Sequence, residues 1–238
     1  MWDAALDLFL GSTCVGCGRG GRPLCRSCAD TLPDHGRVSW PTPSPPGLAL
    51  PMAAGPYDGL LKAMVNAHKE EQVFALAAPL GTVLAAVLAD LVGTLGVPQG
   101  PVVLVPVPSR PAVVRRRGHD PMLRVARSAA ARLRAQGCRA GVARLLEVTG
   151  QVRDQSRLDA AARFENLHGS LRCRRTQRAP GRRYVVVDDV ITTGATAREA
   201  QRALAEGGVP VAGVAAVAAT KRRNAERPGS LPLSVRAD

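Results

Sequence analysis

The chain has 238 residues, of which 46% are hydrophobic and only 3% aromatic, so its core must consist mainly of Ala, Val and Leu. The formal net charge of +13 comes almost wholly from arginine, since Lys62, Lys69 and Lys221 are the only lysines. This charge excludes an acidic protein and leaves two explanations open, a polyanionic partner or a compositional bias toward arginine. The first residues lack a basic segment followed by a long apolar core, so we expect no secretory signal and place the protein in the cytoplasm.

Four cysteines form a spaced pattern within residues 1–38. A short amphipathic helix is expected first, because Trp2, Leu6 and Phe9 fall on one helical face. Next comes CVGCGRGGRPLCRSC, in which seven residues separate two C-x2-C pairs. Two such pairs complete the tetrahedron that Zn²⁺ prefers and leave no position for water, so we predict a structural zinc module. Redox-active or unrelated thiols are the alternative. The predicted ligands are Cys14, Cys17, Cys25 and Cys28.

A proline-rich stretch, SWPTPSPPGLALP at residues 39–51, indicates a stiff and extended linker. After it, residues 60–68 have one apolar helical face, and residues 73–97 form the most apolar run of the chain. The length of this run approaches that of a membrane span, but Pro79 and Asp90 interrupt it. We therefore expect a buried helix that covers a sheet, and no membrane span.

Apolar runs alternate with helical patterns over the predicted main domain, residues 52–220. Continuous apolar strands between helices are typical of an α/β domain whose parallel sheet is covered on both faces. The basic tail, residues 221–238, is expected to be poorly ordered. The predicted strands are VVLVPVP at 102–108, YVVVDDV at 184–190 and VAGVAAVAA at 211–219, and two further helices are expected at 122–133 and 196–206.

One stretch, VVVDDVITTGAT at residues 185–196, joins a buried strand to two acids and a small, hydroxyl-rich loop. In parallel sheets ligands lie beyond the carboxyl ends of the strands, where loop N–H groups and a helix N-terminus can hold a phosphate. Carboxylates cannot donate hydrogen bonds, so Asp188 and Asp189 suit sugar hydroxyls or a Mg²⁺ ion. A sugar phosphate satisfies both halves, and its expected contacts after the acids are Thr192, Thr193, Gly194, Ala195 and Thr196.

A sugar-phosphate site has two alternatives. An ATPase strand would need a G-x-x-x-x-G-K-[ST] element, which none of the three lysines supplies. A merely structural strand, turn and helix cap would explain one threonine but not two acids and three threonines together.

The stretch 185–196 resembles the phosphoribosyl-pyrophosphate (PRPP) motif of type I phosphoribosyltransferases. This motif and the cysteine pattern together make the chain resemble the ComF family of competence-associated proteins. The resemblance covers about residues 14–219, most of the chain. Three further stretches are similar to that family: VPVPSRPAVVRRRGHD at 105–120, YDGLLKAMVNAHKE at 57–70 with Lys69 as its basic residue, and RDQSRLDAAARFENLHGSL at 153–171. The resemblance implies a type I phosphoribosyltransferase fold behind the zinc module, with Mg²⁺ accompanying PRPP.

The resemblance also assigns roles to two basic stretches. It places Pro108, Ser109 and Arg110 in a loop that faces the pyrophosphate. It places Arg115, Arg116 and Arg117 on a mobile arm that closes over the pyrophosphate, where cations would stabilise the departing charge. A solvated basic loop is the alternative for each of these arginines.

The sequence departs from the family after the arm, where His119, Asp120 and Pro121 replace the usual Phe-Asn-Gln. His119 could replace the aromatic ring of the phenylalanine, act as a general base, or be a solvated loop histidine.

Two functions are compatible with these observations. The first is an enzyme that transfers ribose 5-phosphate from PRPP to an acceptor that the sequence does not specify, or a protein that binds PRPP or a nucleotide 5′-phosphate without turnover. The second is a nucleic-acid accessory factor in DNA uptake, since the ComF family is associated with transformation. Few aromatic residues make base stacking a poor main contact, so binding of single-stranded DNA would be mostly electrostatic. Its expected contacts include Arg115–Arg117, residues 221–223 and six arginines: Arg172, Arg174, Arg175, Arg178, Arg182 and Arg183.

Overall fold

The computed structural model describes residues 12–96, 100–149, 168–174 and 181–220. The predicted N-terminal helix, the basic tail and nearly all of the stretch at 153–171 lie outside these residues. The strands are β1 (Arg37–Val38), β2 (Pro51–Pro56), β3 (Val102–Pro106), β4 (Ala140–Val142), β5 (Leu146–Val148), β6 (Leu171–Cys173), β7 (Arg183–Ile191) and β8 (Val211–Ala219). The helices are α2 (Arg26–Ala29), α3 (Gly59–Glu70), the 3-10 turn η1 (Phe74–Leu76), α4 (Ala77–Thr94), α5 (Pro111–Arg117), α6 (Pro121–Ala135) and α8 (Ala195–Glu206).

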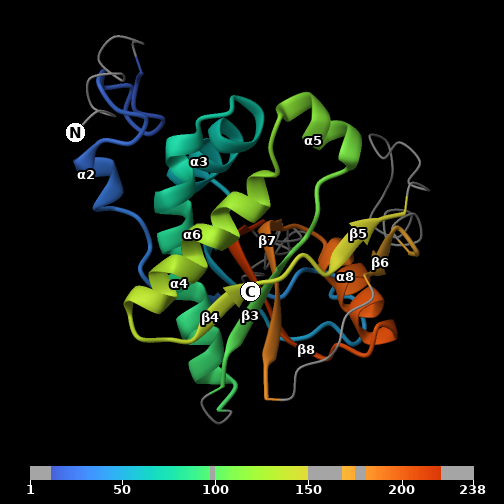
Figure 1. The fold of residues 1–238 in the computed structure, drawn as a ribbon. Helices are drawn as coiled ribbons and strands as arrows, with labels where there is room; N and C mark the ends of the chain where they lie inside the picture. The colour runs from blue at the N-terminus through green and yellow to red at the C-terminus, as the bar shows by residue number, and fades with distance from the viewer. Residues whose placement is uncertain (1–11, 97–99, 150–167, 175–180, 221–238) are drawn as a thin grey trace, which may run out of the picture.

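A six-stranded sheet in the order β1-β2-β8-β7-β3-β4 forms the centre of the molecule (Figure 1). Only β1 runs antiparallel, to β2, and all other neighbours are parallel. Because parallel strands end at the same edge, the carboxyl ends of β2, β8, β7 and β3 lie together. Strands β5 and β6 form a separate antiparallel pair. The predicted α/β architecture with a mostly parallel sheet is confirmed.

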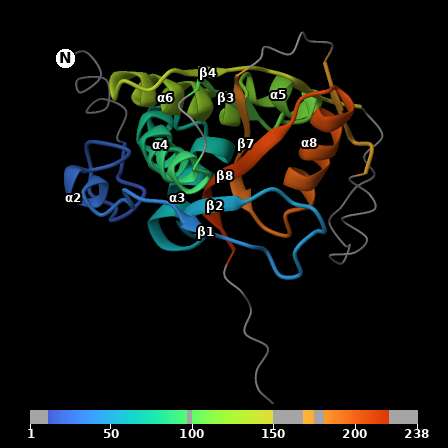
Figure 2. The same cartoon turned by 90° about the horizontal axis from the view of Figure 1, so that it is seen from below.

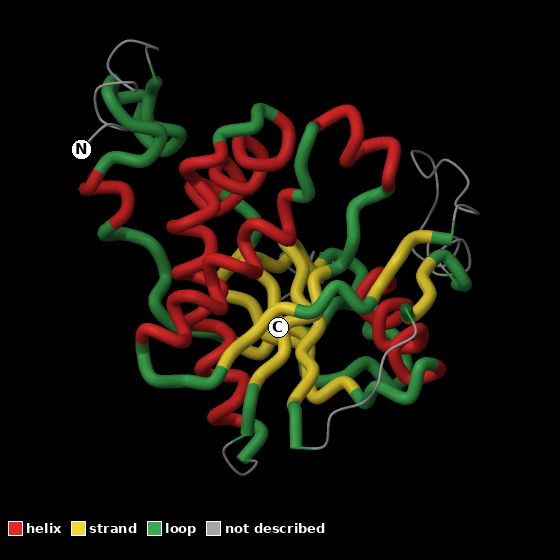
Figure 3. The backbone as a smooth tube through the Cα atoms, viewed as in Figure 1, coloured by secondary structure: helices red, strands yellow, loops and turns green. Residues whose placement is uncertain are grey.

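Helices cover both faces of the sheet, which explains why the middle of each central strand is a continuous apolar run (Figure 3). In β7, Val185 and Val187 pack into one core with α3, α4 and α6. Tyr184 and Val186 point the other way, into a second core with α8. Successive side chains of a strand alternate between faces, so a strand buried on both sides needs apolar residues throughout.

The Ala-rich helix α4, taken together with the turn η1, is long and apolar enough to cross a membrane by length and composition. However, 50% of its most apolar stretch of 18 residues is buried inside the protein. Leu80, Leu84 and Leu88 are at most 1% exposed and lie in the core that covers the sheet. Gly81 permits close contact with α6, since a Cβ atom there would lie 2.4 Å from the Cβ of Ser128. These contacts agree with the predicted buried helix.

The proline-rich stretch is not extended throughout, because the Leu48 N–H closes a turn on the Pro45 carbonyl at 3.2 Å, and it packs against the main domain along α8 (Figure 2). The side chain of Gln201 on α8 accepts a hydrogen bond from the Ala49 N–H and donates one to the Gly47 carbonyl, both of 2.9 Å. The Arg198 Nε donates to the Pro46 carbonyl at 2.9 Å. We call residues 41–49 the strap, because they connect β1 to β2 across the surface of α8.

Several short elements have no counterpart in the sequence patterns. Strand β2 was not predicted, because MAAGP lacks β-branched residues and follows the prolines directly. Strands β1, β4, β5 and β6 have only two or three residues each, too few to show a period. Pairing with neighbours, and not local propensity, establishes these strands.

Candidate functional site

The four predicted zinc ligands come together at the N-terminal side of the molecule. Their Sγ atoms all lie within 4.8 Å of one another, and the Cys17 and Cys25 sulfurs are 3.6 Å apart. In a tetrahedron with zinc–sulfur bonds of about 2.3 Å, neighbouring sulfurs would be about 3.8 Å apart. Among the described residues this is the only group of three or more possible metal ligands.

The local backbone prepares the cysteines for a cation. The Cys25 N–H donates to the Cys14 Sγ at 3.3 Å, and the Gly18 N–H closes a turn on the Cys14 carbonyl at 2.8 Å. Burial raises the pKa of Cys14, but hydrogen bonds from backbone N–H groups outweigh it and lower that pKa to about 6. Four protein thiolates without an open position are consistent with a structural zinc site.

The four-cysteine module lies against helix α3. Val15 and Leu24 pack on the edge of the core that contains α3 and α4, together with Leu60 at the start of α3. Helix α3 is therefore in contact with the module at one side and contributes Lys69 to the site described next.

A cleft of about 600 Å³ opens beyond the carboxyl ends of β7 and β3, where the sequence predicts the ligand. It receives residues from the end of β7, the turn into α8, the loop after β3, and the helices α3, α5, α6 and α8. The predicted site residues that line it are Pro108, Ser109, Arg110, Arg117, Asp188, Asp189, Thr192 and Thr196.

The remaining predicted residues lie beside the cleft. Thr193, Gly194 and Ala195 form the backbone turn between Thr192 and Thr196. Arg115 lines a neighbouring cleft of about 240 Å³, and the side chain of Arg116 is outside the described part of the chain.

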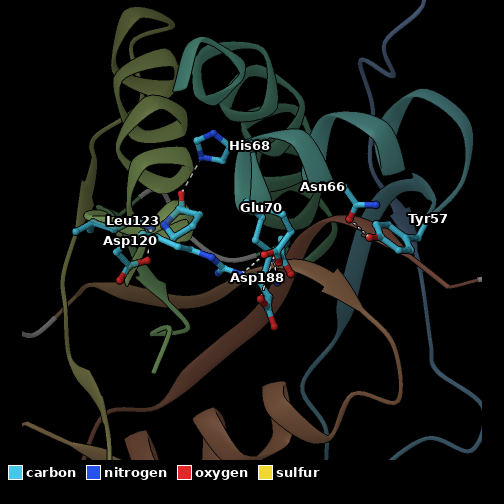
Figure 4. Close-up of polar contacts among 11 residues, drawn as sticks. Tyr57, Asn66, His68, Glu70, Asp120, Leu123 and Asp188 are labelled. Carbon is cyan, nitrogen blue, oxygen red and sulfur yellow. Dashed lines mark hydrogen bonds and ion pairs between the residues drawn. The ribbon is translucent and has the colours of Figure 1, made fainter. Parts of the chain in front are cut away.

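Asp188 and Asp189 stand beyond the end of β3 and face the cleft (Figure 4). Strand β7 continues to Ile191 beside β8, whereas the last pair that it forms with β3 is Val187 with Pro106. The Asp188 Oδ1 accepts a hydrogen bond from the Asp189 N–H at 2.8 Å. The Asp189 carboxylate receives the Lys69 Nζ at 2.6 Å, a contact between residues 120 positions apart.

The pKa values of Asp188 and of its neighbour Lys69 both lie above their usual values. Burial, followed by the negative charge of Asp189, raises the pKa of Asp188 to about 7, while Lys69 acts in the opposite direction. Burial lowers the pKa of Lys69, but the attraction of Asp189 and Asp188 outweighs it and the pKa lies above its usual value. A cation or a hydroxyl-bearing ligand at Asp188 would favour the charged carboxylate.

The turn after β7 leads into the N-terminus of α8. Gly194 precedes the helix with φ +73°, a left-handed conformation that glycine adopts without steric cost. Glycine has no side chain that could cap the first N–H groups, and the first turn of the helix has no acidic residue. The Ala195 N–H donates to the Thr193 hydroxyl at 3.4 Å. These N–H groups and the Thr192 and Thr196 hydroxyls are suited to an anion.

The strap completes this turn from behind. A Cβ atom on Gly194 would lie 2.9 Å from Pro41 Cγ and 3.2 Å from Leu48 Cδ2. The strap thus holds the turn in close contact, and the turn accommodates the strap only because residue 194 is glycine. The sequence contains no signal for this contact, because the two segments are far apart in the chain.

The basic arm is a short helix with one residue directed into the cleft. Arg117 donates to the Glu70 carboxylate, and its side chain is 10% exposed. Its Nε is buried without a partner among the described residues. Arg110, by contrast, is exposed at the mouth of the cleft. The cleft therefore contains three cations, Lys69, Arg110 and Arg117, two of which are already paired with acids.

His119 is not a solvated loop histidine. It is only 7% exposed, its ring meets Phe74 edge to face with centroids 4.6 Å apart, and it does not line the cleft. Nδ1 lies 3.1 Å from the Arg117 carbonyl. Its aromatic packing agrees with replacement of a phenylalanine, and its position gives no support to a role as general base.

Three further polar residues of the cleft, Tyr57, Asn66 and Glu70, were not among the predicted site residues. Glu70 binds Arg117, and Tyr57 donates to the Asn66 side chain at 2.7 Å on the cleft wall (Figure 4). Spacing alone did not assign these three residues a function.

Comparisons with known proteins provide no assignment: no family model matches the chain and no curated protein matches it significantly.

Proposed function

We propose that the chain is a phosphoribosyltransferase-like protein of the ComF type, which binds PRPP or a nucleotide 5′-phosphate together with Mg²⁺. The observation that carries this proposal is the single cleft that combines the acid pair of β7 with the uncapped N-terminus of α8. In our proposal the turn at residues 192–196 holds the 5′-phosphate, and Asp188 and Asp189 bind the ribose hydroxyls. Zinc at the four cysteines would be structural.

The cations explain how a pyrophosphate could be accommodated. Ser109 and Arg110 follow the end of β3, opposite the acid pair, and Arg117 projects from α5 into the same cleft. If PRPP binds with its ribose on the acids, its pyrophosphate lies toward these residues. Mg²⁺ between pyrophosphate oxygens would reduce the repulsion between pyrophosphate and Asp188 or Asp189.

Transfer from this arrangement requires one substitution at C1′ of the ribose. A lone pair of the acceptor nitrogen forms the new bond to C1′. The bond between C1′ and the pyrophosphate oxygen breaks, and its electron pair leaves with pyrophosphate, while the acceptor proton passes to water. Arg110 and Arg117 would stabilise the charge that develops on the leaving group. Positioning of both reactants would supply the remaining rate acceleration.

The nucleic-acid hypothesis stays a prediction with less structural support. Glu147 pairs with Arg172 at 2.6 Å and with Arg174 at 3.6 Å, so part of the positive charge in this segment is neutralised. Arg183 is only 9% exposed. Charge without a built groove attracts many polyanions, whereas the cleft specifies one kind of ligand.

The test is the thermal stability of the protein with PRPP and Mg²⁺. Ligand at 100 times its Kd should add about 2.7 kcal/mol, which corresponds to a rise in Tm of roughly 5–10 °C for a chain of this length. Asp188→Asn and Asp189→Asn should abolish most of the rise. The matched control is Asp34→Asn, which removes an equal charge from a side chain that is 96% exposed. An unchanged Tm in the parent protein would refute the proposal. If the Tm rises, an assay for pyrophosphate release with added nucleobases separates turnover from binding.

A further inference from the structure

The basic arm α5 is held at its C-terminal end by the histidine that follows it. Gly118 turns the chain with φ +70° after Arg117, and the next side chain, His119, is buried. Its Nδ1 lies 3.1 Å from the Arg117 carbonyl. Because a carbonyl only accepts hydrogen bonds, Nδ1 carries the hydrogen and donates it. The ring is therefore linked directly to the arginine of the arm that lines the cleft.

The His119 ring also joins the arm to the helices that cover the sheet. Phe74 of η1 meets it edge to face with centroids 4.6 Å apart, and the His68 ring of α3 lies 5.9 Å away at 73°. The guanidinium of Arg124 on α6 covers the Phe74 ring at 4.4 Å. Three elements thus surround one side chain, and they fix where the arm ends.

His68 forms the second half of this histidine pair. It is 2% exposed, and its ring nitrogens lie 3.2 Å from the Val73 carbonyl and 3.3 Å from the Pro121 carbonyl (Figure 4). Burial lowers the pKa of His68, the two carbonyls act in the opposite direction, and His119 and Arg124 lower it further. His68 is therefore packed without charge at neutral pH.

The second nitrogen of His119 makes the anchor sensitive to a proton. This Nε2 is buried and has no hydrogen-bond partner among the described residues. In the neutral ring it carries no hydrogen, since Nδ1 donates to Arg117, so its burial costs little. A proton on Nε2 would create a buried N–H without an acceptor, and a buried charge.

The charges around the histidine pair do not compensate such a proton. Glu70 is paired with Arg117, and Asp120 accepts the Leu123 N–H at 3.2 Å. Glu70 is 53% exposed, so water screens its hold on Arg117 and the ring remains the main anchor. Turn η1 contributes no charged residue. The charged groups on the surrounding elements are Lys69 and Glu70 of α3, Arg117 of α5, and Asp120 and Arg124 at the start of α6.

We propose that His119 is a positioning residue, which together with His68 holds Arg117 in the cleft while both rings are uncharged and releases the arm when acid protonates them. The inference rests on the proposed function only for what Arg117 does in the cleft, since the anchoring is measurable without a ligand. It gives a role to the position where the chain departs from the ComF pattern. The phenylalanine of that pattern could pack in the same way but could not titrate.

The experiment measures hydrogen exchange of the arm, residues 111–119, in the full chain without ligand at pH 7.5 and pH 5.5, corrected for the intrinsic effect of pH on exchange. A released histidine has an ordinary pKa of about 6.5, so each histidine can lower the protection of the arm at pH 5.5 by at most about 10-fold. The parent should show this fall. His119→Phe should keep the protection at pH 7.5 and lose about 5- to 10-fold less than the parent at pH 5.5.

Two further variants complete the comparison. His119→Ala should lower the protection of the arm at both pH values by about 5- to 150-fold, because it removes one aromatic contact and one hydrogen bond. Protection of the buried helix α4 should stay as in the parent, which shows that the variant is folded. The matched control is His35→Gln, which removes a half-exposed histidine paired with Asp34 and should respond to pH as the parent does.

The outcomes separate this inference from the proposed function. An equal fall in protection at pH 5.5 in the parent and in His119→Phe would overturn the inference, and so would an arm that His119→Ala leaves fully protected. Pyrophosphate with Mg²⁺ should raise the protection of the arm at pH 5.5, because it would bind Arg117 in the cleft. If it has no such effect while His119→Phe still removes the response to pH, the proposed contact of Arg117 with pyrophosphate is wrong and the anchor is retained.

Discussion

Asp188 has an unusual environment for a carboxylate. It lies next to Asp189 in sequence, inside a cleft, and the cation that faces the pair, Lys69, contacts Asp189 and not Asp188. Its pKa of about 7 means that the folded protein retains a proton that the unfolded chain loses near pH 4. Ionisation of Asp188 therefore destabilises the fold at neutral pH, and a cation or a hydroxyl-bearing ligand that contacts this carboxylate would reduce the effect.

The sign of this effect predicts a pH dependence of stability. Because the folded-state pKa of Asp188 is raised, its contribution to the free energy of unfolding falls as the pH rises from about 4 to 7 and is constant above that range. Asp188→Asn should be more stable than the parent at pH 8 by at most about 4 kcal/mol, and the difference should vanish toward pH 4. Urea unfolding of both proteins between pH 4 and pH 8 measures it. A difference that stays constant across this range would show that Asp188 ionises normally.

At the scale of elements, the strap and helix α8 form one unit with the turn at Gly194. Gln201 holds Gly47 and Ala49, Arg198 holds Pro46, and Pro41 contacts Gly194. The strap thus touches the proposed phosphate turn at Gly194. Its prolines limit the conformations of the unfolded chain, so less entropy is lost when it packs.

Gly194→Ala tests this unit. The added Cβ would take an unfavourable left-handed conformation and would also collide with Pro41 Cγ at 2.9 Å. We expect a loss of about 2–5 kcal/mol in the free energy of unfolding and weaker binding of ribose 5-phosphate. Chemical denaturation and calorimetry provide the two readouts.

Gly208→Ala is the matched control. Gly208 has the same φ of +73°, but nothing lies within 4 Å of a Cβ atom there. It should therefore lose only the conformational part, about 1–2 kcal/mol, and bind ribose 5-phosphate normally. Equal effects of the two variants would mean that the strap contact contributes nothing.

The whole molecule consists of a small cysteine module attached to a large α/β unit with its own cores. A module of this size buries little apolar surface, so bound metal would supply much of its folding free energy. The sheet and its helices, by contrast, have two extensive buried clusters that do not include the cysteines.

Removal of metal should therefore unfold the module and spare the sheet. The purified protein should contain about one zinc per chain, and Cys17→Ser should reduce this content by more than about half. The control Cys138→Ser changes an exposed cysteine outside the cluster and should leave the zinc content unchanged. Elemental analysis measures the metal. Far-ultraviolet circular dichroism of Cys17→Ser should retain the helical signal, and a collapse of that signal would show that the module supports the whole fold.

The patterns that the sequence predicted correctly are local. The two C-x2-C pairs lie within 15 residues, and the buried strands and helices show their character over one element. In β7 the run of valines reflects burial on both faces, and in α6 the apolar spacing from Met122 to Leu133 reflects burial on one face. Such patterns depend on the geometry of a single strand or helix, which is the same in every protein.

Tertiary structure alone decided how these pieces meet. The contact between Lys69 and Asp189 joins residues 120 positions apart, and the strap reaches Gly194 only because β2 pairs with β8. By itself, the sequence determined the elements, the cysteine cluster and the acid–threonine motif, since each follows from short-range chemistry. Parallel pairing of distant strands determined the cleft and its ion pairs, because no local pattern records which strands become adjacent.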